Sequence, residues 1–180
     1  GDRPSEALTL GNLVSHCVER GRMDEALAFQ QLTLDIEREA TGGRHVGRAL
    51  ARLGWLQYLQ GQLDLAEASL RAAIESYRKT SDPRAEGTTH GELGEVLTRQ
   101  GRREEARKAF EDGEALLDKV GAHLSLAKLL CHRGHHELGG GDRAAASATL
   151  ARAQQTAESL GASDASDLGQ EIARLRAALA

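Results

Sequence analysis

The chain repeats itself every 40 residues, and this repeat constrains the fold more than any other feature of the sequence. The clearest marker is a glycine that recurs in one register: Gly21, Gly61, Gly101 and Gly141. A second column holds small residues in the same register: Ala7, Gly47, Gly87 and Ala127. A third column holds leucine in three copies and arginine in the fourth: Leu13, Leu53, Leu93 and Arg133. Independent columns that share one period indicate four similar structural units.

Each unit has the pattern of two helices joined by a short turn. In the second copy the first helix is expected from about Arg48 to Gln60, with an apolar stripe at helical spacing: Leu50, Leu53 and Leu56. Gly61 then ends this helix, because glycine readily adopts the left-handed conformation that follows a helix end. A second amphipathic stripe follows: Ala66, Leu70, Ala73, Ile74 and Tyr77. Connections this short make neighbouring helices pack antiparallel.

Residues 162–180 depart from the repeat and have the pattern of a closing helix. Ser163, Asp164 and Ser166 can cap its start, and its apolar side is formed by four residues: Leu168, Ile172, Leu175 and Leu179. Such a helix covers the packing surface that the last repeat would otherwise expose. We therefore predict an all-α fold, an α-α superhelix of four antiparallel helix pairs plus a C-terminal capping helix. The predicted pairs are at about 5–42, 43–82, 83–121 and 122–161, and the cap is at 162–180.

Composition argues against several classes of partner. The formal net charge is -4, and no block of lysine and arginine could follow a phosphate backbone, so no nucleic-acid partner is expected. No apolar run approaches the roughly 20 residues that a membrane helix needs, so no membrane partner is expected either. Cys17 and Cys131 are too few for a disulfide framework, and they favour a reducing, cytoplasmic setting.

The repeat resembles the tetratricopeptide repeat family. The first-helix signature is present as Leu53-Gly54 and Leu93-Gly94. The second-helix signature recurs in three copies: Ala66, Leu70 and Ala73; Ala106, Phe110 and Gly113; and Ala146, Leu150 and Ala153. The resemblance covers residues 5–161. The chain departs from the family in its period, since the usual repeat has about 34 residues, and in lacking the closing proline. His90 and Arg133 also stand at apolar positions of the pattern. The resemblance implies a solenoid of the tetratricopeptide type, whose first helices line a concave groove.

On this resemblance, seven residues of the first helices are candidates for a partner-binding groove: Arg48, Arg52, Trp55, Tyr58, Glu95, Lys128 and His135. Trp55 and Tyr58 are the expected anchors, because these side chains bury much area with few rotatable bonds. The alternative is that Trp55 packs between repeats. Family members that grip a peptide C-terminal carboxylate use a set of lysines and asparagines, and only four residues approximate it: Asn12, Arg48, Arg52 and Lys128. That mode is not expected.

His132, His135 and His136 have the i, i+3, i+4 spacing that can converge on a metal, with Glu95 as the candidate neighbour of His135. Surface histidines beside a glycine-rich turn are the commoner case, so neither a metal site nor a cofactor is predicted. No nucleophile lies in an evident pair with a base, and no catalytic residue is predicted. Cys17 is expected to be buried. Cys131 stands at a groove position, where packing is favoured over reactivity.

We expect a protein- or peptide-binding scaffold or regulatory module, monomeric and not an enzyme. The chain begins at Gly1 without an initiator methionine, which favours an excised piece of a longer protein. Arrays of this period resemble those of large bacterial signalling proteins, so the C-terminal part of such a protein is the expected context. The alternative is a structural array that packs on its own N-terminal domain or mediates self-association.

Overall fold

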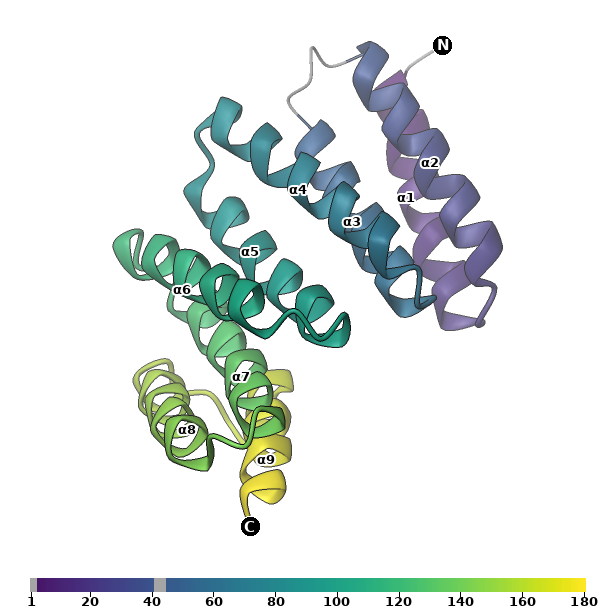
Figure 1. Cartoon of the computed structure of the whole chain (residues 1–180). Helices are drawn as coiled ribbons and strands as arrows, with labels where there is room; N and C mark the ends of the chain where they lie inside the picture. The colour runs from purple at the N-terminus through teal and green to yellow at the C-terminus, as the bar shows by residue number, and fades with distance from the viewer. Residues whose placement is uncertain (1–2, 41–44) are drawn as a thin grey trace. The chain divides into compact units, whose positions relative to one another are not determined.

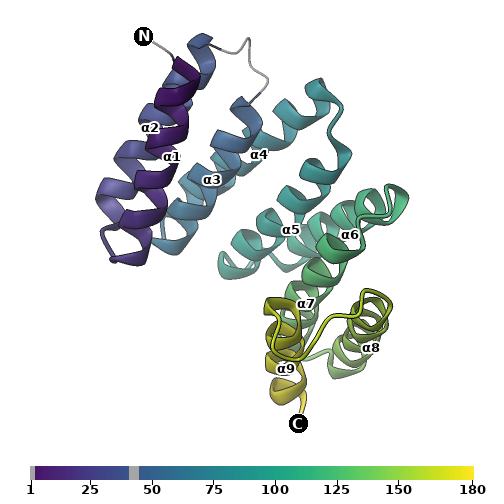
Figure 2. The same ribbon diagram turned by 180° about the vertical axis from the view of Figure 1, so that it is seen from behind.

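The computed structural model describes residues 3–40 and 45–180, and within these ranges the chain forms nine helices and no strand (Figures 1 and 2). The helices are α1 (Arg3–Glu19), α2 (Met23–Ala40), α3 (Val46–Leu59), α4 (Leu63–Thr80), α5 (Pro83–Arg99), α6 (Arg103–Lys119), α7 (His123–Gly139), α8 (Arg143–Ser159) and α9 (Asp167–Leu179). The predicted boundary between the first and second repeats, at residues 42 and 43, lies outside the described residues.

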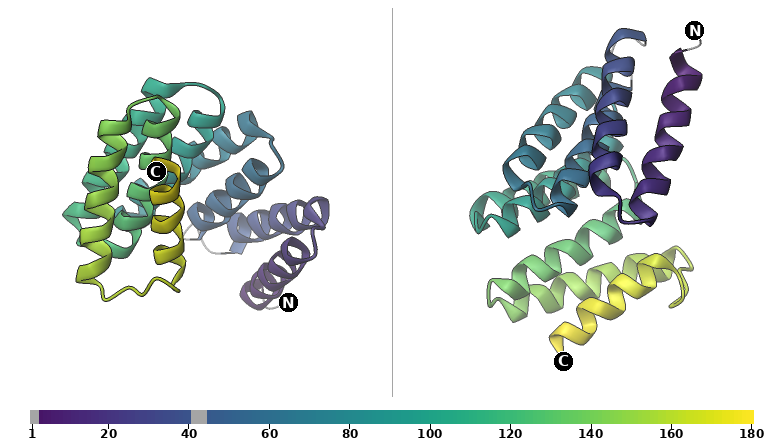
Figure 3. Two further views of the ribbon diagram at one scale, coloured as in Figure 1. Left: turned by 90° about the horizontal axis from the view of Figure 1, so that it is seen from below. Right: turned by 90° about the vertical axis from the view of Figure 1, so that its right-hand side faces the viewer.

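The helices divide between two compact units, Gly1–Ala85 and Glu86–Ala180, and each unit has its own packing. In the N-terminal unit α1 packs on α2, α2 on α3 and α3 on α4. In the C-terminal unit α6 packs on α7 and α7 on α8, and α9 lies against both α7 and α8 (Figure 3). The pairing of consecutive helices within each unit follows from the short turns between them.

The predicted turns at the four repeating glycines are confirmed. Gly21, Gly61, Gly101 and Gly141 all have positive φ, from 70° to 85°. Next to Gly61, the Gln62 amide donates a hydrogen bond to Gln57 O at 2.9 Å. This bond is typical of a helix C-terminus that is followed by a left-handed glycine. Helices α4, α6 and α8 end in the same way, at Ser81 with φ of 54° and at Gly121 and Gly161 with φ of 64°. At Ser81 a residue with a side chain adopts the left-handed conformation, whereas the other described turns have glycine at this position.

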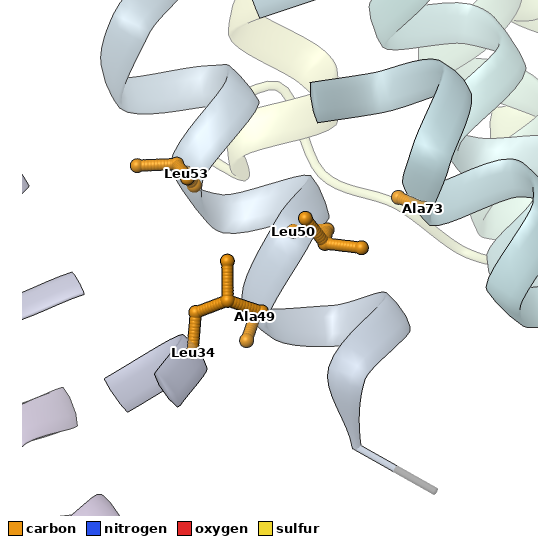
Figure 4. Packing of buried hydrophobic residues seen from close by; sticks show 5 residues of the cluster. All are labelled: Leu34, Ala49, Leu50, Leu53 and Ala73. Atoms are coloured by element: carbon orange, nitrogen blue, oxygen red, sulfur yellow. The ribbon is translucent and has the colours of Figure 1, made fainter. Parts of the chain in front are cut away.

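Close approach between helices depends on small residues that face large ones. A Cβ on Gly54 would lie 2.8 Å from Leu70 Cγ, which shows how tightly α3 packs on α4. The core of the N-terminal unit joins three helices, and Figure 4 shows its buried cluster: Leu34, Ala49, Leu50, Leu53 and Ala73. Aromatic residues make up only 3% of the sequence, so leucine and alanine fill this core.

The closing helix covers the last pair with the apolar side that the sequence indicated. Leu168, Ile172 and Leu175 are buried, and Leu179 is half-buried. Leu175 packs against Gly134 of α7 so closely that a Cβ there would collide with it. The helix begins at Ser166, whose hydroxyl accepts a hydrogen bond from the Gly169 amide at 3.1 Å.

Candidate functional site

Helix α3 carries a stacked aromatic pair. The rings of Trp55 and Tyr58 have centroids 4.9 Å apart and planes inclined by 25°. Both side chains are half-buried, and their i, i+3 spacing places them one turn apart on the same helix side. Offset aromatic stacks of this kind stabilise one another by about 0.5–1.5 kcal/mol beyond area burial. The pair therefore forms one semi-rigid apolar feature with part of its surface open to solvent.

Two arginines stand one and two turns before this pair on α3. Arg52 is half-buried, and its Nη2 donates to Gly11 O at 3.2 Å and to Ser15 Oγ at 2.7 Å, both on α1. Burial, and then the like charge of Arg48, lower the pKa of Arg52. Arg48 is exposed and makes no hydrogen bond or ion pair with any residue that the structure describes. The result is a fixed guanidinium beside a second one that is available for an anion.

These arginines line a cavity of about 460 Å³ between α1, α2 and α3. The described residues of its wall are Ala7, Leu8, Gly11, Asn12, Ser15, Gln30, Thr33, Glu37, His45, Arg48, Ala49 and Arg52. A volume of this size lies within the range of about 300–1,000 Å³ that is typical of ligand sites. The predicted residues Arg48 and Arg52 are therefore brought together at one hollow of the N-terminal unit.

The residues of α2 in this cavity were missed by sequence reasoning, which considered only the first helix of each pair. Gln30, Thr33 and Glu37 are all buried. The equivalent positions of the other copies hold apolar or small residues: Leu70, Ala73 and Tyr77; Phe110, Gly113 and Leu117; Leu150, Ala153 and Ala157. The sequence signal that could have indicated the cavity was the presence of three polar residues at core positions in one copy alone.

The remaining predicted site residues belong to the C-terminal unit, where one prediction was wrong. The histidine neighbour of Glu95 is His132, not His135: Glu95 Oε1 contacts His132 Nδ1, and His135 is exposed. The reason is the rotation of α7, which is set by its packing and turns His132 toward α5. His132 Nε2 also lies 3.9 Å from Glu171 Oε2 of α9. Lys128 is half-buried on the same helix.

The histidines of the 132–136 cluster on α7 have different neighbours. His136 Nδ1 is 2.8 Å from Thr98 Oγ1, and its ring lies 5.6 Å from that of Phe110. Within residues 3–40 and 45–180, no three histidine, cysteine, aspartate or glutamate side chains form a group that could hold a metal ion.

Cys131 is buried, and burial followed by the charge of Glu171 raises the pKa of its thiol to about 12.

Arg48, Arg52, Trp55 and Tyr58 therefore share one helix of the N-terminal unit, whereas Glu95, Lys128 and His135 belong to the other unit. A single groove that joins both sets stays a prediction.

Comparison with known protein families identifies the repeat in the first four helices. A profile of the tetratricopeptide repeat matches residues 5–79, which include most of α1 to α4. Residues 5–79 therefore carry the tetratricopeptide repeat. No curated protein sequence matches this tetratricopeptide repeat chain significantly.

Solved structures with low sequence identity share the fold. BtubC from P. vanneervenii is 18% identical with a TM-score of 0.77, over 89% of this chain and 66% of BtubC. Aspartyl phosphate phosphatase F from Bacillus subtilis is 13% identical with a TM-score of 0.85, over 98% and 46% of the two chains. A Podosopora anserina kinesin light chain with nearly identical TPR-like repeats is 17% identical with a TM-score of 0.75, over 99% and 88%.

These matches confirm the all-α, tetratricopeptide-type fold class. The tetratricopeptide repeat chain spans about half to two thirds of the length of the first two structures, so the likeness concerns fold alone. Among the described helices, none combines the length and the apolar character needed to cross a membrane.

Proposed function

We propose that this tetratricopeptide repeat chain is a protein- or peptide-binding module that holds a partner segment along α3. The observation that carries the proposal is the stripe formed by Arg48, Arg52 and Trp55, which follow an i, i+4, i+7 spacing and so share one helix face. The stacked Trp55–Tyr58 pair supplies an apolar anchor, and the arginines supply positive charge. An apolar segment that carries acidic residues matches both features.

The proposed role is binding without catalysis, in the cytoplasm, as part of a larger bacterial signalling or regulatory protein. The raised pKa and the burial of Cys131 support a packing role for the thiol that stands nearest to the predicted groove positions. Two free cysteines suit a reducing compartment. The bacterial context is supported by the excess of arginine over lysine in the composition.

Self-association or docking on another domain is the second candidate, and a specific observation favours it. Leu8 of α1 is 70% exposed, the highest value among the exposed large hydrophobic residues that the structure describes. Light scattering after size-exclusion chromatography, at several protein concentrations, separates the candidates. A monomer that retains peptides supports the binding module, and a dimer that Leu8→Ser dissociates supports self-association.

Peptide binding is tested with immobilised nine-residue peptides that are degenerate in sequence, acetylated and amidated. We expect the chain to be retained, and Trp55→Ala to lose most of this retention. Leu65→Ala is the matched control, because Leu65 is a 55% exposed apolar residue on α4 of the same unit. Equal retention of both variants and wild type would argue against α3 as the contact surface.

A further inference from the structure

We propose that the cavity between α1, α2 and α3 is a specific subsite for an acidic side chain of the bound segment. The carboxylate of a glutamate or aspartate pairs there with Arg48 and Arg52, while a backbone N–H of the same segment donates to Gln30. This inference rests on the proposed peptide-binding function and specifies its ligand chemistry.

Gln30 provides the first observation. Its side chain is 1% exposed, and its Nε2 donates to Ala49 O at 2.9 Å. Because a carbonyl oxygen can only accept, this hydrogen bond fixes the orientation of the amide and leaves Oε1 as the free end. Gln30 Oε1 is buried and has no hydrogen-bond partner among the described residues. A buried acceptor without a donor is unfavourable, so a ligand N–H that reached it would be bound selectively.

The charges of the lining provide the second observation. Arg48 and Arg52 are one turn apart, and the charge of Arg48 already disfavours the protonated form of Arg52. Hydrogen bonds to Gly11 and Ser15 hold the Arg52 guanidinium in place. Among the described residues of the lining, Glu37 contributes one carboxylate against the two arginines, which leaves an excess of positive charge. An incoming carboxylate removes the repulsion between the two guanidinium groups and finds one of them already oriented.

The repeat itself supplies the third observation. The α2 positions of Gln30, Thr33 and Glu37 are core positions, filled by apolar or small residues in the other three copies. Polar groups at such positions lower stability unless they are satisfied or used. Departures of this kind from a consistent packing pattern concentrate at functional sites. The first copy alone therefore carries a polar hollow where the others carry packed apolar side chains.

The rest of the lining favours a side-chain carboxylate as the ligand. Ala7, Leu8 and Ala49 add apolar surface beside the polar groups. The methylenes of a glutamate or aspartate can contact this apolar part while the carboxylate reaches the arginines. The same residue also has a backbone N–H, so one acidic residue satisfies both Gln30 and the arginines.

Three immobilised libraries of nine-residue acetylated peptides test the proposal with the full chain. The first has a central glutamate and an amidated C-terminus, the second a central glutamine and an amidated C-terminus, and the third a central glutamine and a free C-terminal carboxylate. We expect at least ten-fold more protein on the first library than on the second. Arg48→Gln should remove this difference, whereas Arg20→Gln should keep it, because Arg20 is an exposed arginine of the same unit outside the cavity.

A second variant keeps the test independent of folding defects. Gln30→Leu places at this position the residue that two other copies have, Leu70 and Leu150, so the variant should fold. It should retain its thermal midpoint or raise it, yet bind the glutamate library more weakly, because the backbone N–H of the bound segment loses its acceptor.

Three results would overturn the inference. Equal retention on the first two libraries would remove the acidic subsite but leave peptide binding intact. Stronger retention on the third library would assign the cavity to a C-terminal carboxylate instead. Retention on none of them would reject the subsite together with the proposed function.

Discussion

Gly94 of α5 lies directly against the ring of Phe110 of α6: a Cβ at Gly94 would be 2.7 Å from Phe110 Cε1. Carbon atoms in contact are ordinarily about 3.5–4.0 Å apart, so the two helices are too close for any side chain at position 94. Phe110 is fully buried and cannot move aside into solvent. The glycine of the Leu-Gly signature is therefore required for the packing of the helix pair.

Gly94→Ala should lower the free energy of unfolding by about 1–2 kcal/mol. Overpacking of this kind costs about 1–3 kcal/mol, and the higher helix propensity of alanine offsets up to about 1 kcal/mol of it. Gly139→Ala is the control, because a Cβ on Gly139 meets no atom within 4 Å. Urea denaturation followed by circular dichroism measures both variants. If the two behave alike, the close approach of α5 and α6 is incorrect.

Ser81→Gly should stabilise the chain by about 1 kcal/mol. Ser81 has φ of 54° at the end of α4, a conformation that costs an L residue about 1–2 kcal/mol and glycine very little. The greater flexibility of glycine in the unfolded state offsets part of the gain. Thermal and urea denaturation measure the change. Ala72→Gly, an exposed position inside the same helix, should show the opposite sign, a loss of about 1 kcal/mol.

The architecture could be predicted because the repeat encodes it locally. Gly61 ends one helix, and the leucines on either side set the apolar faces, so the sequence alone places each helix to within a few residues. Ser81 could not be found in this way, because serine gives no local sign of left-handed backbone. Only the register, which places Gly121 and Gly161 at the equivalent positions, hints at it.

The candidate site could be predicted only in part. Arg48, Arg52, Trp55 and Tyr58 were found because they follow one helix face. The pairing of Glu95 with His132 was not found, because contacts across helices depend on the rotation of each helix, and packing rather than spacing sets that rotation. The part of the cavity formed by α2 was missed for a related reason. Those residues lie on the second helix of the pair, which the family pattern assigns to packing.

Both cysteines should resist modification in the native chain. Cys17 and Cys131 are 1% and 2% exposed. The thiol pKa of Cys131 is raised to about 12, so at pH 8 only roughly one molecule in 10,000 carries the thiolate that reacts. A colorimetric disulfide reagent should therefore report almost no thiol before unfolding and two per chain in guanidinium chloride. Rapid reaction of either thiol in the native state would contradict the burial of that cysteine.

Trp55 separates the two hypotheses about α3. As a binding anchor it should contribute to partner affinity far more than to folding, because part of its surface faces solvent. As a side chain wedged between helices it should contribute mainly to stability, and its removal would cost about 3–5 kcal/mol. Its half-buried position and its stack on Tyr58 favour the first hypothesis.

Trp55→Ala should weaken peptide binding by about 2 kcal/mol or more and lower the free energy of unfolding by only about 1 kcal/mol. The first value is that of a hot-spot residue, and the second is the lost ring stack on Tyr58. Circular dichroism melts beside wild type measure the stability, since the variant lacks the sole tryptophan and cannot be followed by its fluorescence. Tyr58→Ala should show the same stacking loss, and the double variant should lose less than the sum of the two, because the stack can be broken only once. A fall of 3 kcal/mol or more in the stability of Trp55→Ala would instead make Trp55 a packing residue, and the anchor on α3 would have to be abandoned.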